Sequence, residues 1–78
     1  MDVTLHTTTK IVELEHDGAT VPARVWEGHT ASGVPVVAFI TRITAERDAD
    51  LTEFQRDLQQ ASPPSAEVQA WPMRMLID

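Results

Sequence analysis

Residues 10–26, KIVELEHDGATVPARVW, decide the fold. Two β-rich runs, Lys10–His16 and Ala19–Trp26, flank the dipeptide Asp17-Gly18. Asp-Gly between alternating segments is a strong hairpin signal, because a type I′ turn needs positive φ at both of its central positions. The sequence therefore predicts a hairpin whose two strands pair outward from this turn, starting with His16 opposite Ala19.

The predicted turn also determines which side chains share a face of the hairpin. It places Leu14 opposite Val21, with the pairs Val12–Ala23 and Lys10–Val25 following along the strands. One face then carries Val12, Leu14, Val21, Ala23 and Val25. The other carries Ile11, Glu13, Glu15, Arg24 and Trp26. Both faces are thus apolar near Trp26.

A third strand is predicted at Val34–Ile43, after a turn in which Gly33 adopts a left-handed conformation. Apolar side chains occupy both of its faces, a pattern typical of a strand covered on both sides. Pro22 lacks an N–H on the side where this strand should pair, so we expect a lost ladder bond or a bulge there.

One helix is predicted at Asp48–Gln60, where Leu51, Phe54 and Leu58 fall on one stripe. Asp50, followed three residues later by Glu53, resembles a capping box. The prolines of Ser62–Ser65 cannot continue a helix. Pro72–Ile77 alternates in the manner of a final strand.

These elements predict a single α+β domain over residues 1–78, in the order β-β-β-α-β. We expect a mostly antiparallel four-stranded sheet with one helix on one face. The helical link allows a right-handed crossover, so the fourth strand should run parallel to the third and lie beside the first. Residues 1–9 are either a flexible arm or the start of the first strand.

Composition narrows the classes of function. The chain has 78 residues, no cysteine and a net charge of −6. The missing cysteines exclude disulfides and thiolate metal sites, and the charge disfavours binding to nucleic acid. No apolar run is long enough for a membrane helix and no signal peptide is visible, so we expect a cytoplasmic protein that binds no membrane.

The sequence has few residues in the patterns that catalytic sites need. The serines lie in predicted turns without a nucleophile motif, and no glycine-rich phosphate loop is present, so we expect neither an enzyme nor a cofactor.

Three alternative functions remain open. An unbroken hairpin register would place His6 opposite His29, with Glu27 on the same face, as a small metal-binding or catalytic site. Asp48, Asp50 and Thr52 have the spacing of calcium ligands, but Glu53 and Gln59 stand where that motif needs Gly and Glu, so helix capping is the favoured interpretation. An acidic chain could also imitate DNA.

A protein–protein interaction surface is the favoured hypothesis. The predicted helix can cover only one face of the sheet, which leaves the other apolar face open. Exposed apolar patches mark interfaces, and Trp is a common interface anchor. The predicted contact residues are Ile11, Trp26, Val37 and Phe39. The partner is either a second copy, giving a homodimer, or another protein; alternatively, residues 1–9 or the Ser62–Trp71 link cover this face.

Three stretches also carry a resemblance: VPARVWEGHTASGVPVVAFITRI at 21–43, AERDADLTEFQRDLQ at 45–59 and WPMRMLI at 71–77. In these stretches the chain resembles small uncharacterised proteins of bacteriophages that infect actinobacteria. The resemblance implies a cytoplasmic protein, made in an infected bacterium, that engages a host protein. It implies no catalytic or binding residues.

Overall fold

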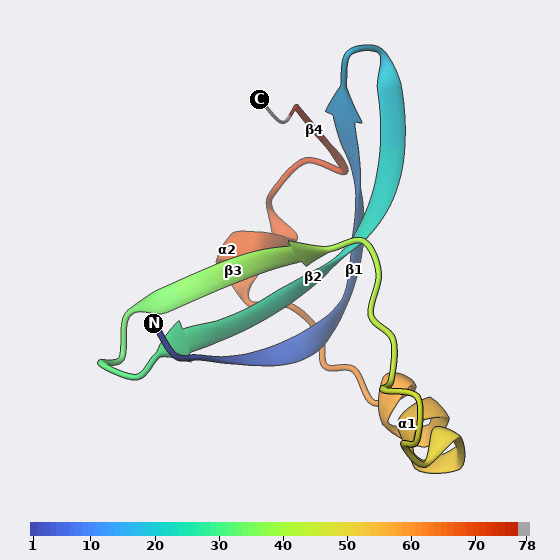
Figure 1. Ribbon diagram of the computed structural model, residues 1–78. Coiled ribbons are helices and arrows are strands. Elements are labelled where there is room, and N and C mark those ends of the chain that lie inside the picture. Colours follow the sequence, from blue (N-terminus) through green and yellow to red (C-terminus); the bar gives the residue numbers. More distant parts are fainter. Residues whose placement is uncertain (77–78) are drawn as a thin grey trace.

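A long two-stranded hairpin forms the centre of the protein (Figure 1). The computed structural model describes residues 1–76. Strands β1 (Val3–His16) and β2 (Ala19–Thr30) are antiparallel, and Asp17 and Gly18 between them have φ values of 50° and 80°. Both values are positive, as a type I′ turn requires. The predicted pairs next to this turn are confirmed, including His16 with Ala19 and Leu14 with Val21.

Two further strands complete a four-stranded sheet of order β3-β2-β1-β4. Strand β3 (Pro35–Ile40) is antiparallel to β2, and β4 (Arg74–Leu76) is parallel to β1. The predicted α+β class, the mostly antiparallel sheet and the place of the last strand beside the first are confirmed. Residues 1–9 include the start of β1, and Gly33 has the predicted positive φ, 90°. Ile77, the predicted end of the last strand, lies outside the described residues.

Strand β3 is shorter than predicted, and Pro22 explains where it ends. The pairing of β2 with β3 stops at Arg24 opposite Ile40. Two residues further on, the same register would place Arg42 opposite Pro22, which has no N–H to donate. The chain leaves the sheet at Thr41 instead. The pairing that we expected to be lost at Pro22 is therefore lost because β3 ends before it reaches this residue.

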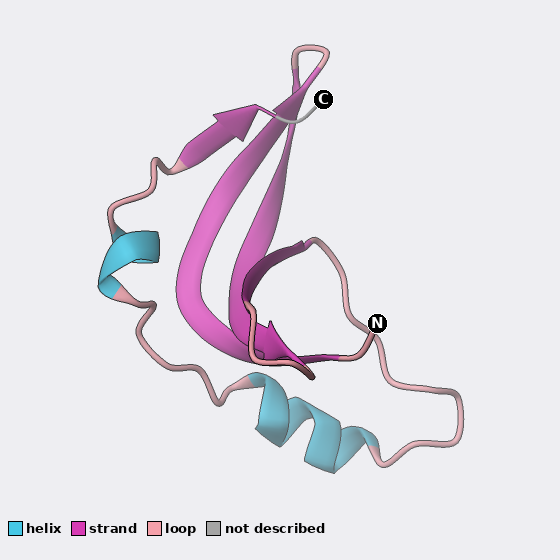
Figure 2. Ribbon diagram, turned by 90° about the vertical axis from the view of Figure 1, so that its left-hand side faces the viewer, coloured by secondary structure: helices cyan, strands magenta, loops and turns pink. Residues whose placement is uncertain are grey.

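A bulge interrupts the hairpin where no break was expected. Thr7 pairs with Trp26 and Ile11 with Arg24, so three residues of β1 lie opposite one residue of β2. The Thr8 hydroxyl stabilises the bulge, donating to the Val25 carbonyl at 2.6 Å. The predicted pairing of Lys10 with Val25 is therefore wrong, and the register shifts for every residue before the bulge. Bulges bend strands, and Figure 2 shows both long strands strongly curved.

Helix α1 (Leu51–Leu58) is shorter than predicted and does not cover the sheet. It buries none of its residues, and Figure 1 shows it beyond the sheet, at the end of the loop that follows β3. The expectation that this helix covers a sheet face is wrong, because the segment that follows it occupies the core face. That segment contains the short helix α2 (Ala66–Gln69) and then β4.

The core lies between one sheet face and the segment after α1. Val68 of α2 is fully buried together with sheet residues, and a second set packs around them. The buried sheet residues are Val12, Leu14, Ala23 and Val25, and the surrounding set is Val37, Phe39, Trp71 and Met75. The Phe39 and Trp71 rings have their centroids 6.1 Å apart. The Ser62–Trp71 link thus covers the Val12 face of the sheet.

Charged side chains of the hairpin hold α2 at both ends. The Glu27 carboxylate accepts hydrogen bonds from the Ser65 N–H at 2.8 Å and the Ser65 hydroxyl at 2.6 Å, just before the helix. At the other end, the buried Lys10 ammonium donates to the carbonyls of Val68, Gln69 and Trp71 at 2.9, 3.1 and 2.6 Å. A negative group at a helix start and a positive group at its end both suit the helix dipole.

No helix within residues 1–76 combines the length and the apolar character needed to cross a membrane.

Candidate interaction surface

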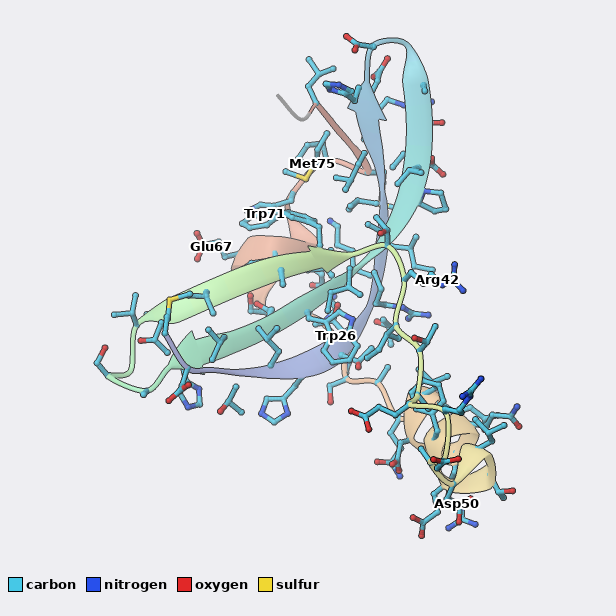
Figure 3. The ribbon with its side chains drawn as sticks, viewed as in Figure 1. Trp26, Arg42, Asp50, Glu67, Trp71 and Met75 are labelled. Carbon is cyan, nitrogen blue, oxygen red and sulfur yellow. The ribbon has the colours of Figure 1, made fainter. Side chains whose placement is uncertain are left out.

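The sheet face opposite the core carries Trp26. Strand pairing sets Ile11, Arg24 and Ile40 side by side across three strands, and the next row consists of Thr7, Trp26 and Ala38. Residues directly opposite each other in antiparallel strands point to the same face. In Figure 3, Trp26 projects toward the loop that carries α1, whereas Trp71 lies beside α2. We call this side of the sheet the Trp26 face.

A shallow groove of about 400 Å³ runs along the Trp26 face. The sheet forms its floor, and the chain that follows β3 and the end of α1 form its wall. Ile11, Ile43 and Leu58 in this groove are 44%, 45% and 43% exposed. The lining residues are Thr7, Ile11, Pro22, Ala23, Arg24, Trp26, Ile40, Thr41, Arg42, Ile43 and Leu58. Large aliphatic and aromatic side chains therefore remain accessible on this face.

The groove is locally basic, although the chain as a whole is acidic. Among residues 1–76, Arg24 and Arg42 are its charged lining residues, and no carboxylate of this part of the chain lines it. The Arg24 guanidinium donates to the Thr8 carbonyl at 3.1 Å, so the bulge in β1 holds this side chain across the floor of the groove. An apolar floor with two cations favours a ligand that is apolar and carries negative charge.

The structure separates the four predicted contact residues into two pairs. Ile11 and Trp26 lie on the Trp26 face, and Ile11 lines the groove beside Trp26. Val37 and Phe39 lie on the opposite face, because they pair with Glu27 and Val25 and pack against the core. Of these four residues, only Ile11 and Trp26 can therefore contribute to a contact surface on the Trp26 face.

Three large aliphatic residues of the groove were not among the predicted contacts. Ile40 lies on the apolar third strand, and Ile43 follows it in the loop. Leu58 belongs to the apolar stripe of α1. The sequence shows this apolar stripe, but it predicts that the stripe is buried against a sheet face, whereas Leu58 is exposed in the groove.

The bulge disrupts the histidine arrangement considered as a metal site. His6 lies opposite Glu27 and His29 opposite Thr4, so the two histidines do not pair. The Glu27 carboxylate is already occupied by Ser65. Within residues 1–76, no three His, Cys, Asp or Glu side chains are grouped so that they could hold a metal ion.

Asp50 caps α1. Its carboxylate accepts hydrogen bonds from the N–H groups of Thr52 and Glu53, at 3.0 and 3.1 Å. This geometry accounts for the acidic residue at the helix start that the calcium-ligand spacing had singled out.

No family model matches the chain, and searches of curated proteins and of solved structures give no significant match.

Proposed function

We propose that this protein is a non-enzymatic protein–protein interaction domain that binds another protein chain through the Trp26 face. The observation that carries the proposal is the open apolar groove in front of Trp26. The covering segment of the fold, α2 with Trp71 after it, lies on the other face of the sheet. Clustered exposed apolar side chains on a folded domain usually mark a contact surface.

The total exposed surface supports this proposal. The chain exposes 6073 Å², whereas a compact monomer of 8.7 kDa is expected to expose about 4,700 Å². The difference is roughly 1,400 Å². The radius of gyration is 13.9 Å, compared with about 11.5 Å for a compact domain of this length. A single copy thus exposes more surface, and is less compact, than a typical monomeric domain of its size.

The groove also indicates the chemistry of the bound segment. Apolar side chains would fill the space in front of Trp26, and a carboxylate would lie near Arg24 and Arg42. We therefore propose an apolar segment with an acidic residue as the ligand. The resemblance to actinobacteriophage proteins suggests a host protein as its source, so an actinobacterial host is the setting for the test.

Site-specific photocrosslinking tests the proposal. A photoreactive amino acid replaces Ile43 at the groove and, in a separate control variant, Val21 near the hairpin turn. These positions are 45% and 46% exposed, so they are matched in accessibility. We expect a protein adduct from position 43 that is absent from position 21 and is lost when Trp26→Ala is added.

The opposite outcomes would refute the proposal. If position 43 forms no protein adduct in cells, the Trp26 face does not contact another chain. Equal adducts from positions 43 and 21 would indicate random collision. Circular dichroism of each variant confirms that the sheet remains folded.

A further inference from the structure

The two sides of the central hairpin end in edges that differ in how far they are paired with other segments. Along β1, Ser62 bonds to the backbone of Thr7 and Thr9, and β4 then pairs with Glu13–Glu15. This edge is therefore largely occupied. Strand β3 forms the opposite edge, and no strand of the described part of the chain pairs with its outer side. An unpaired edge strand is a template for another strand.

The register identifies the backbone groups on the open edge. The Thr30 N–H donates to the Val34 carbonyl, so the even-numbered residues of β2 direct their backbone groups toward β3. Their partners Val36, Ala38 and Ile40 consequently face β2. Val37 and Phe39 lie between them, and their N–H and C=O groups point away from the sheet.

The open edge lacks the usual protection against pairing. Strand β3 reads PVVAFI, with no charged residue, and its one proline is the first residue of the strand. The pairing with β2 has no register shift that would twist the edge away. Natural sheets that avoid edge pairing use inward charges, central prolines or bulges.

We infer that the β3 edges of two copies pair antiparallel, giving a homodimer with one continuous sheet. A two-fold axis at Ala38 places Val37 opposite Phe39 of the second copy, and the outward backbone groups of these two residues then bond reciprocally. The same strand meets itself, so the contact is self-complementary. Because β3 carries no charged residue, the two-fold axis brings no like charges together.

This dimer goes beyond the proposed function, because it uses the sheet edge rather than the Trp26 face. Joining the edges would also bring Val36, Ala38 and Ile40 of both copies together on the Trp26 side of the sheet. The two surfaces nevertheless have separate tests, because disulfide trapping at Ala38 reports only the edge, and photocrosslinking at Ile43 supports the groove only where the adduct is with a protein other than a second copy.

Disulfide trapping tests the edge contact, because the native chain has no cysteine. At the axis, the two copies of Ala38→Cys would have Cα atoms about 4.5 Å apart, within disulfide reach. In the matched control Val36→Cys, on the same face of the same strand, the two cysteines would lie about 13 Å apart. We expect rapid covalent dimerisation of Ala38→Cys and little of Val36→Cys. Equal rates, or no dimer from Ala38→Cys, would overturn the inference.

A second variant measures the dimer without a covalent bond. Ala38→Lys would place two ammonium groups opposite each other at the axis, and we expect the dissociation constant to rise by a factor of roughly one hundred. Val21→Lys, near the hairpin turn, should leave it unchanged. Sedimentation equilibrium gives both values, with circular dichroism as the folding control. An unchanged dimer in Ala38→Lys would exclude the β3 edge.

Discussion

Lys10 shows how one side chain can anchor the segment that follows α1. Its side chain lies on the buried face of β1, an unusual place for a lysine. Three carbonyl oxygens at the end of α2 satisfy its ammonium group. The bond ties the segment after α1 to the core face of the sheet and leaves the Trp26 face open.

We predict that Lys10→Met destabilises the protein by about 2–4 kcal/mol, because the charged hydrogen bonds are lost and the carbonyls of α2 lose their donor. Urea denaturation measures the change. Arg74→Met, at an exposed position of β4, is the control and should change stability by no more than about 0.5 kcal/mol. A Lys10→Met variant as stable as the native protein would show that the ammonium group does not hold α2.

Gly28 is required for a different reason, the close approach of two backbones. A Cβ atom there would overlap the Thr4 carbonyl of β1. We predict that Gly28→Ala costs about 2–4 kcal/mol, because backbone rather than a flexible side chain must move. Gly33→Ala is the comparison: it meets open space but has a φ of 90°, so it should cost about 1–2 kcal/mol. Thermal unfolding of both variants tests this order, and the reverse order would contradict the strand pairing at Gly28.

At the scale of elements, local signals predicted the hairpin and the place of the last strand, but not the helix packing. Asp17-Gly18 carries its own turn geometry, so the pairs beside it could be derived from sequence. The bulge lies in a run of threonines, TTTK at 7–10, that gives no comparable signal. Its register shift removed the predicted histidine pair.

The packing of α1 could not be predicted, because its apolar stripe shows which side of the helix is apolar but not which surface that side contacts. The same limit applies to Val37 and Phe39: their face depends on the register between β2 and β3, which the turn before β3 determines. Ile11 and Trp26, within the hairpin, were correctly assigned to one face.

Helix α1 should behave as a separate, weakly stabilised element. Its Asp50 cap is exposed and the helix buries no residue. We predict that Asp50→Ala destabilises the helix by about 1 kcal/mol while the stability of the sheet changes by less than about 0.5 kcal/mol. Hydrogen exchange should show faster exchange in residues 51–58 and unchanged protection in β1 and β2. Uniformly faster exchange would contradict this independence.

At the scale of the whole molecule, the fold has a small core and an extended surface. Within residues 1–76, five apolar residues are buried. Domains this small usually need an additional source of stability, and association is one such source. Binding to the folded state stabilises it by mass action. We therefore predict that the thermal midpoint rises with protein concentration in calorimetry. A midpoint independent of concentration would contradict stabilisation by self-association.

We predict that two copies of this chain associate through the open edge of β3. Light scattering of the purified protein, over a range of concentrations, tests this claim most directly. One chain has a mass of 8.7 kDa, and we predict a shift toward twice this value as the concentration rises. A mass of one chain at every concentration would contradict the edge-to-edge dimer.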